Sequence, residues 1–342
     1  MWRIHGVDYD LRGLSRVHPG GSVAIDLVQG MDATDLFEQF HVRNEKHRAL
    51  LSKYSVTQRA AAPVSAFHDD VKAMVREHFG TTSHKASPAH RWQMVVLCLA
   101  YASCWVGWWR GSIFVGGFCL PVVAWLVMTN ASHDASHFAF STTPLLNEAW
   151  LLAASPLLYS CASWYVQHCV SHHLHTNDPD NDADLQHHPF AKWHAKVDRR
   201  TTPAKNLAWH ATAYLVATLN MSLVHPWKFV VVPLAKTILL GHPPFDDQTT
   251  KHHEAAFFRA ADLVHRSGFF AKRPHRLVFA LAAWVASLLF LVTPHLRFDL
   301  PRALALSLLP YALTSLVFML VTQISHRRPA STMRRNPTFG AS

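Results

Sequence analysis

The chain has 342 residues; half of them are hydrophobic, only 16% are charged, and the formal net charge is +10. This composition excludes a disordered chain and is too apolar for an ordinary soluble protein, so we expect a membrane protein. The positive charge would also suit nucleic acid. No basic patch with interleaved aromatic residues lies outside the apolar stretches, however, so no nucleic acid partner is expected. The five cysteines have no paired spacing, which argues against a disulfide scaffold and a zinc ribbon.

Residues 1–57 are a zone of mixed charge that contains His18-Pro19-Gly20-Gly21 and, further on, His41. This pattern resembles cytochrome b5, a small α+β domain in which two such histidines are the axial ligands of haem b. The resemblance implies that His18 and His41 bind the haem. Two imidazoles leave no open position on the iron, which then passes electrons without binding oxygen.

Two further expectations concern this haem domain. His47 is a weaker second ligand, because its distance along the chain from the motif is too long. The resemblance also implies a strand and a helix before the region that starts at Trp2, so we expect a domain clipped at its N-terminus. Taken alone, the His-Pro-Gly-Gly motif could also be only a turn.

Residues 58–91 are polar and are interpreted as a linker, and four long apolar runs follow. Each run is close to the about 20 residues that a membrane-spanning helix needs, and they pair into two helical hairpins. The runs are Trp92–Trp109 with Ile113–Met128, and Leu277–Val292 with Ala303–Thr322. The predicted fold is therefore mainly α, an integral membrane domain of about four transmembrane helices behind the small α+β domain.

Two other stretches, Leu145–Trp164 and residues 205–240, are apolar but carry polar or charged residues, and we expect both at the membrane surface. Lysine and arginine are concentrated between Ala191 and Arg276 and again after His326, whereas the hairpin turns are short. By the positive-inside rule, both termini and both histidine clusters described next lie on the cytosolic side.

Two histidine clusters follow apolar runs, and five of their histidines are candidate metal ligands: His133, His137, His168, His172 and His173. On an α-helix, positions i and i+4 share a face, so the first two can approach one metal, as can His168 and His172. His173 would lie about 100° further round. Neutral imidazole binds iron, copper and zinc, and so many histidines without a four-cysteine pattern favour an oxygen-activating iron site. For either cluster alone, histidines satisfied at the surface or in the core remain an alternative.

The motifs His-Asp-x-Ser-His and His-x-x-x-His-His, in this order behind a cytochrome b5-like domain, resemble the membrane front-end fatty acid desaturases from about Trp2 to His326. The resemblance implies a di-iron centre that inserts a cis double bond between an existing double bond and the carboxyl end of a polyunsaturated acyl chain. It also implies an acyl-lipid or acyl-CoA substrate, an NADH-dependent cytochrome b5 reductase as electron donor, and a multi-pass position in the endoplasmic reticulum membrane.

Acidic residues near the clusters would orient the imidazoles through hydrogen bonds. The candidates are Asp134, Asp178, Asp180, Asp182 and Asp184. The alternative for the run from Asp178 to Asp184 is a solvated loop.

The chain departs from the family near its end, where the expected third cluster, Gln-x-x-His-His, does not occur. The resemblance makes His326 an accessory ligand, so we expect an incomplete desaturase domain over residues 92–326 and an aberrant basic tail over 327–342. Neither Gln248 with His252-His253 nor Gln186-His187-His188 has the right spacing. We therefore expect the chain as written to have little or no activity. A sphingolipid long-chain-base desaturase, a hydroxylase, or a non-catalytic membrane protein that binds haem or iron remain alternatives.

Overall fold

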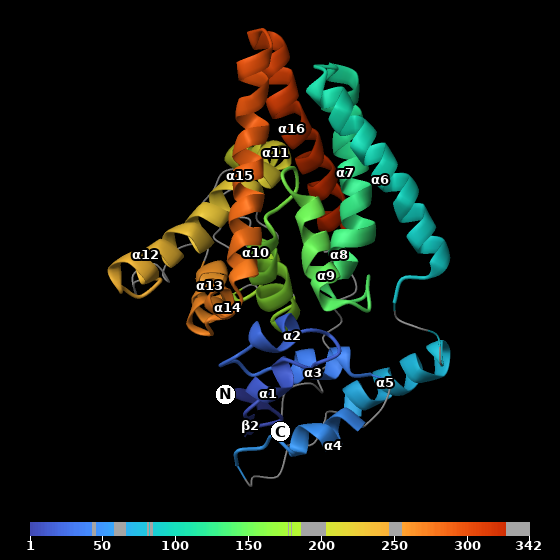
Figure 1. The fold of residues 1–342 in the computed structure, drawn as a ribbon, viewed down its shortest axis with the longest axis vertical. Coiled ribbons are helices and arrows are strands. Elements are labelled where there is room, and N and C mark those ends of the chain that lie inside the picture. The colour runs from blue at the N-terminus through green and yellow to red at the C-terminus, as the bar shows by residue number, and fades with distance from the viewer. Residues whose placement is uncertain are drawn as a thin grey trace.

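The structure is a computed structural model that describes residues 1–42, 46–57, 66–80, 82, 85–176, 178, 180–185, 203–245 and 255–325. The chain is mainly helical, with one two-stranded sheet near the N-terminus (Figure 1). The long helices form a bundle, and the N-terminal domain lies against one end of it. This arrangement confirms the predicted fold class.

The N-terminal domain is built on a β-hairpin that buries one face of its two strands. Strands β1 and β2 pair antiparallel, with Trp2 opposite Tyr9 and Ile4 opposite Val7, and these four side chains are buried. The turn residues His5 and Gly6 both have positive φ, as a tight hairpin of right-handed twist requires. The elements are β1 (Trp2–Ile4), β2 (Val7–Tyr9), α1 (Arg12–Ser15), α2 (Val23–Asp26), α3 (Thr34–Phe40) and α4 (Lys46–Ser52).

A helix, α5 (Ala66–Phe79), occupies part of the stretch predicted as a linker. It is tied to the N-terminal domain through Glu38, a carboxylate on α3 that is almost fully buried. Glu38 pairs with Lys72 of α5, with Arg48 at 2.9 Å and with His5 at 2.7 Å. A buried carboxylate is tolerated only when it is paired, so this cluster fixes α5 on the domain.

The first hairpin of the membrane part joins α6 to a helical run broken by π-helical segments. Its elements are α6 (Pro88–Trp109), η1 (Ile113–Cys119), α7 (Leu120–Val127), η2 (Met128–Ser132) and α8 (His133–Ser136). The second hairpin joins α15 (Pro274–Arg297) to α16 (Leu300–Ser325). The turns of the two hairpins meet at the end of the bundle farthest from the N-terminal domain (Figure 1).

Gly111 lets these turns approach. It has a φ of +81°, and a Cβ built there would lie 2.7 Å from the Phe298 ring. Next to it, the Arg297 guanidinium lies 3.6 Å from the centre of the Trp109 ring. A side chain at position 111 would therefore be excluded both by backbone conformation and by space.

The remaining elements lie beside the hairpins or between them and the N-terminal domain (Figure 1). They are α9 (Pro144–Trp150), η3 (Leu151–Ala154), α10 (Cys161–Trp164), η4 (Tyr165–His172), η5 (Ala183–Leu185), α11 (Pro203–Leu219), η6 (Asn220–Val224), η7 (Trp227–Val231), α12 (Val232–Leu240), α13 (Ala255–Arg266) and α14 (Phe269–Lys272). The stretch Leu145–Trp164 is therefore divided into short pieces, and Leu151, Leu157, Leu158 and Tyr159 within it are buried inside the protein.

Within the part of the chain that the structure describes, four helical runs are long and apolar enough to cross a membrane, the number predicted, but one of them differs from the prediction. They are Ile113–Ser136, Tyr214–Leu240, Pro274–Arg297 and Leu300–Val321. The helix that contains Trp92–Trp109 is not among them, and the run Tyr214–Leu240 is the one not predicted.

The helical run from α11 to α12 corrects the expectation that residues 205–240 lie along the surface. Thr218 of α11 is fully buried against α16, where its backbone N–H and its hydroxyl bond to Ser315 and its hydroxyl reaches the carbonyl of Tyr311. The first half of the run is thus packed in the bundle, while α12 projects obliquely from it (Figure 1).

Candidate metal centre and haem site

The first histidine cluster lies at the end of the run that contains η2 and α8. The rings of His133 and His137 are 4.7 Å apart between centres, so they point to the same side as the i, i+4 spacing predicted. His137 is the C-terminal capping residue of α8. The helix therefore ends at the cluster, and its last histidine stands at the edge of the apolar run.

The second cluster stands on η4, a π-helix that ends at His172, and on the next residue, His173; this corrects the expectation of an α-helix with His173 about 100° further round. The wider turn of a π-helix brings residues five apart onto one face. The Nε2 atoms of His168 and His173 consequently lie only 3.2 Å apart. Two nitrogens bound to one metal at about 2.0–2.1 Å each are separated by about 3 Å. His172 remains close, with its ring stacked 5.2 Å from that of His168.

The two clusters converge. All five histidines predicted as metal ligands lie together, and they are called the box histidines below and their site the box site. Ring centres of His168 lie 5.4 Å from both His133 and His137, and those of His137 and His173 are 4.7 Å apart. Two groups have ligand atoms within 4.8 Å of one another: His133, His137 and His168, and His168, His172 and Asp184. Among the described residues His168 belongs to both groups, so it lies at the centre of the cluster.

Two aspartates of the acidic run contact the imidazoles from behind. Asp184 accepts from Nδ1 of His168 at 3.1 Å and from Gln167 at 2.8 Å, and Asp182 accepts from Nδ1 of His172 at 3.0 Å. These bonds leave each Nε2 free for a metal. Elsewhere in the run, the Asp178 carboxylate accepts from the Asp180 backbone N–H and the Asn181 side chain.

The remaining candidate carboxylate, Asp134, is half exposed and lies 3.7 Å from His133. The surroundings of His137 and His173 keep these two imidazoles neutral. Burial, and then the neighbouring imidazoles, lower the pKa of His137 to about 2 and that of His173 to about 3. A neutral imidazole has the lone pair that a metal needs.

Sequence reasoning missed the aromatic support and a group of unsatisfied polar atoms beside the cluster. Trp164 stacks on His168 at 4.2 Å, and Tyr159 stacks on Trp164 at 4.1 Å. Among the described residues, several buried side-chain atoms near η4 have no hydrogen-bond partner: Tyr159 OH, Ser160 Oγ, Ser163 Oγ, Trp164 Nε1 and Gln167 Oε1. Such atoms call for water or a ligand, and the converging imidazole nitrogens themselves fit a metal site.

The predicted haem ligands His18 and His41 face each other in the N-terminal domain. Their ring centres are 6.1 Å apart, and two imidazoles on opposite sides of one iron at about 2 Å have centres about 6 Å apart. Nδ1 of His18 bonds to the Gly21 carbonyl at 3.2 Å and Nδ1 of His41 to the Phe37 carbonyl at 2.7 Å. Burial lowers the pKa of both rings, so both stay neutral and keep Nε2 for iron.

Two details refine this haem site. A Cβ at Gly20 would lie 3.0 Å from Cε1 of His18, which explains a glycine beside the ligand. The ring of His47, ranked lower by its spacing, lies 4.6 Å from that of His41. The structure therefore places His47 beside the haem site, although the facing pair is His18 and His41.

Some predicted residues lie outside the described part of the chain. They are the accessory ligand His326 with the tail over 327–342, the alternative ligands His252 and His253, and Gln186-His187-His188.

Comparison with known proteins bears on both halves of the chain. Residues 103–340 match the Fatty acid desaturase family, and residues 1–59 match the Cytochrome b5-like Heme/Steroid binding domain. These families imply a di-iron centre in the membrane part and haem in the N-terminal domain. No solved structure matches the chain.

Three relatives illustrate the similarity. An acyl-lipid omega-13 desaturase from Chlamydomonas reinhardtii is 30% identical over 372 aligned positions, covering 95% of this chain and 72% of that protein. An acyl-lipid (7-3)-desaturase from Rebecca salina is 31% identical, covering 53% of this chain and 41% of the relative. An acyl-lipid (8-3)-desaturase B from Dictyostelium discoideum is 29% identical, covering 61% and 47%. The chain thus spans less than half of the last two relatives and most of the first, and it belongs to the fatty acid desaturase family with a cytochrome b5-like domain at its N-terminus.

Proposed function

We propose that this protein is a front-end acyl desaturase that inserts a cis double bond into a polyunsaturated acyl chain, using dioxygen and electrons relayed by its own haem domain. The observation that carries the proposal is the convergence of five histidines from two separate helical segments, with His168 shared by two metal-sized groups. The relatives named as acyl-lipid desaturases support the same class of substrate. An acyl-lipid or an acyl-CoA substrate would reach the site from the bilayer.

In this proposal the box histidines hold the metals through Nε2. A di-iron centre at this position supplies the redox chemistry that activates dioxygen. The protein orients the ligands: Asp184 and Asp182 fix the rings of His168 and His172, and stacking on Trp164 restrains His168 from its flat side. Such outer contacts set both the geometry and the basicity of metal-bound imidazoles.

The site stands where apolar helices end, which suits an oily substrate with a polar head. His133 directly follows the run Ile113–Ser132 and belongs to a candidate membrane span, whereas His168, His172 and His173 lie outside the candidate spans. An acyl chain held among the helices could thus present a methylene group to the cluster while its carboxyl end stays near the surface. The buried polar atoms of Ser163 and Tyr159 offer hydrogen-bond partners beside this position.

The proposal includes the electron supply and the cellular location. His18 and His41 bind haem b, an NADH-dependent cytochrome b5 reductase reduces it, and both histidine clusters and both termini face the cytosol from the endoplasmic reticulum membrane. The lysine and arginine content of the segments on this side supports the orientation. The domain boundaries at residues 1–57 and 92–326 belong to the same proposal.

Expression of the full chain in yeast supplied with polyunsaturated fatty acids tests the function. We expect non-haem iron in the purified protein. Because the motif Gln-x-x-His-His does not occur in the sequence, gas chromatography of the lipids should show few or no new double bonds, and any that form should lie on the carboxyl side of existing ones. His137→Ala should abolish both, while His78→Ala, a matched change on α5 far from the cluster, should leave both unchanged. A purified chain with haem and no non-haem iron would refute the proposal. Haem and iron without product would favour the non-catalytic alternative.

A further inference from the structure

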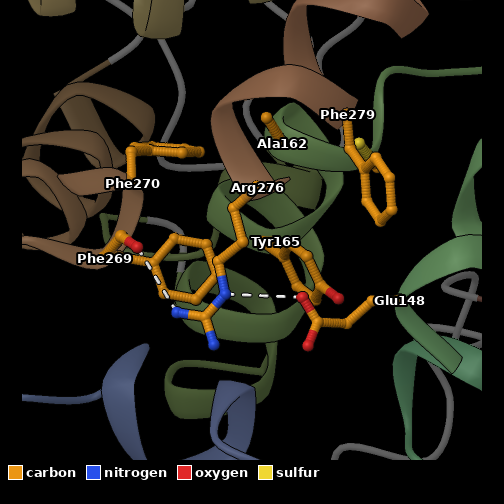
Figure 2. A pocket seen from close by; sticks show the side chains of 8 residues that line it. Glu148, Ala162, Tyr165, Phe269, Phe270, Arg276 and Phe279 are labelled. Atoms are coloured by element: carbon orange, nitrogen blue, oxygen red, sulfur yellow. Dashed lines mark hydrogen bonds and ion pairs between the residues drawn. The ribbon is translucent and has the colours of Figure 1, made fainter. Parts of the chain in front are cut away.

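A buried arginine joins the haem domain to the desaturase domain. Arg276, near the start of α15, donates to Asp26 at 3.1 Å and to Ser22 at 2.7 Å on the haem domain, and to Glu148 of α9 at 3.4 Å. Its side chain is 2% exposed and its guanidinium lies 4.2 Å from the ring centre of Phe269 (Figure 2). A buried guanidinium with two carboxylate partners from different domains fixes their relative position.

The glycine pair of the haem motif also takes part in this interface. Gly21 has a φ of +88°, and a Cβ there would lie 2.6 Å from the Cβ of Pro144, the first residue of α9. The backbone of the haem-ligand loop thus touches the desaturase domain directly, a few residues after the first histidine cluster.

Phe40 spans the short gap between the two redox sites. It is the last residue of α3 and directly precedes the haem ligand His41. Its ring stacks on the box residue His137, with centres 6.4 Å apart and planes at 27°, and lies 5.8 Å from the ring of Phe138. Phe40 is 46% exposed. It adjoins the proposed haem ligand His41 in the chain, and its ring pairs with that of the proposed metal ligand His137.

The backbone at Phe138 shows that this contact is built at a cost. The N–H of Phe138 bonds to the carbonyl of Ala135 and the N–H of Ala139 to that of Asp134, a Schellman motif that ends α8. The left-handed position of this motif usually holds glycine, but here it holds Phe138 with a φ of +58°. A bulky residue is strained in this conformation. Its ring meets Phe40, which gives a reason to keep an aromatic residue there.

We infer that Phe40 is the contact through which electrons pass from the haem domain to the first histidine cluster, and that Arg276 is the positioning residue that holds this contact. The inference rests on the function proposed above. In each transfer one ferrous haem is oxidised to ferric and one ferric iron of the box site is reduced to ferrous, with no bond broken and no proton moved. A pair of irons takes two such transfers, and a flavoprotein reductase that draws on NADH reduces the haem again between them.

The first arm of the test measures electron transfer in the full chain loaded with haem and iron. The haem is reduced anaerobically by a laser-flash photoreductant that supplies less than one electron per chain, and its reoxidation by the ferric box site is followed in the visible spectrum. Phe40→Ala should slow reoxidation about tenfold, because it removes the aromatic pair with His137 and Phe138. Phe40→Tyr should stay close to wild type. Phe67→Ala, an equal truncation at an exposed site on α5, is the matched control.

Two further readouts separate the route from a general structural effect. The haem spectrum and the direct reduction of the box iron by a small chemical reductant should be unchanged in Phe40→Ala. Arg276→Gln should slow the haem-to-iron step, and Arg276→Lys should restore part of the rate. Wild-type rates in Phe40→Ala would overturn the inference.

The second arm tests the contact without any metal. The pair Phe40→Cys with Phe138→Cys should be joined by a short bis-thiol cross-linker, whereas Val17→Cys with Phe138→Cys should not, because Val17 is an exposed residue of the haem domain with no place in this interface. Failure of the first pair to cross-link in a folded chain would overturn the docked arrangement. A wild-type chain that binds no box iron would instead refute the proposed function, and with it the electron route, even if the cross-link formed.

Discussion

The two histidine sites differ in what stands behind the imidazoles. In the haem site, Nδ1 of His18 and His41 bonds to backbone carbonyls, whereas in the box site Nδ1 of His168 and His172 bonds to Asp184 and Asp182. A carbonyl fixes the tautomer and the ring position, while a carboxylate also makes the imidazole a stronger donor. A centre that only passes electrons needs imidazoles with a fixed tautomer and position. A centre that must support oxidised iron also benefits from imidazoles that are stronger donors.

The largest effect should come from the histidine shared by both metal groups. We expect His168→Ala to remove most of the box iron and to lower desaturation by at least about 100-fold, since even the loss of an outer partner costs 10–100-fold at metal sites. Metal analysis of the purified protein and fatty acid profiling measure the two effects. The haem spectrum should not change, because the two sites have separate ligands. Retained iron with retained product would remove His168 from the centre.

The next effect concerns the haem ligands. His41→Ala should abolish the low-spin spectrum of a haem with two imidazole ligands, while box iron stays bound. His47 lies beside His41, so the double variant His41→Ala with His47→Ala is needed to exclude a substitute ligand. If the low-spin spectrum survives the double variant, His41 is not the ligand.

A smaller effect isolates the carboxylate itself. Asp184→Asn keeps the shape of the side chain but removes its charge, and should weaken iron binding by about 10–100-fold. Asp178→Asn makes the same change in the same loop, where the carboxylate accepts from the Asp180 backbone N–H and the Asn181 side chain, and it should bind iron normally. Equal iron affinities in competition with a chelator would show that the carboxylates do not tune the box site.

The smallest effect is expected at the haem motif. Gly20→Ala places a Cβ 3.0 Å from His18, so the ring must shift slightly, at a cost of about 1 kcal/mol for overpacking. Haem should dissociate moderately faster in transfer to apomyoglobin. Gly13→Ala introduces the same methyl group where nothing lies within 4 Å, and its haem dissociation should match wild type.

The sequence predicted those features that depend on local pattern. Long apolar runs gave the two hairpins, and the order of the histidine motifs led to a single cluster, because an apolar helix that ends in histidines places them at one end of the bundle. The pair His18 and His41 was predicted from the resemblance to cytochrome b5. The structure brings their rings to 6.1 Å between centres, and their role as haem ligands stays a prediction.

Other features depend on contacts between distant segments, which no local pattern encodes. The π-helical turn of η4 brings His173 close to His168. An α-helix over the same residues would place the two histidines on different sides of the helix. Only packing decides which aspartates of the acidic run contact imidazoles. The same holds for the burial of Thr218 on α16 and for Arg276, a charged residue whose partners lie more than a hundred positions away.

The central claim, that the box histidines form one metal centre separate from the haem, is tested most directly by X-ray absorption at the zinc edge of the full chain loaded with haem iron and with Zn²⁺ in the box site. Zinc also binds imidazole, and its edge is free of the haem signal. The account predicts a shell of imidazole nitrogens at about 2.0–2.1 Å with no sulfur, and a clear loss of these nitrogens in His168→Ala. A shell of oxygens or sulfurs, or a spectrum unchanged in His168→Ala, would contradict it.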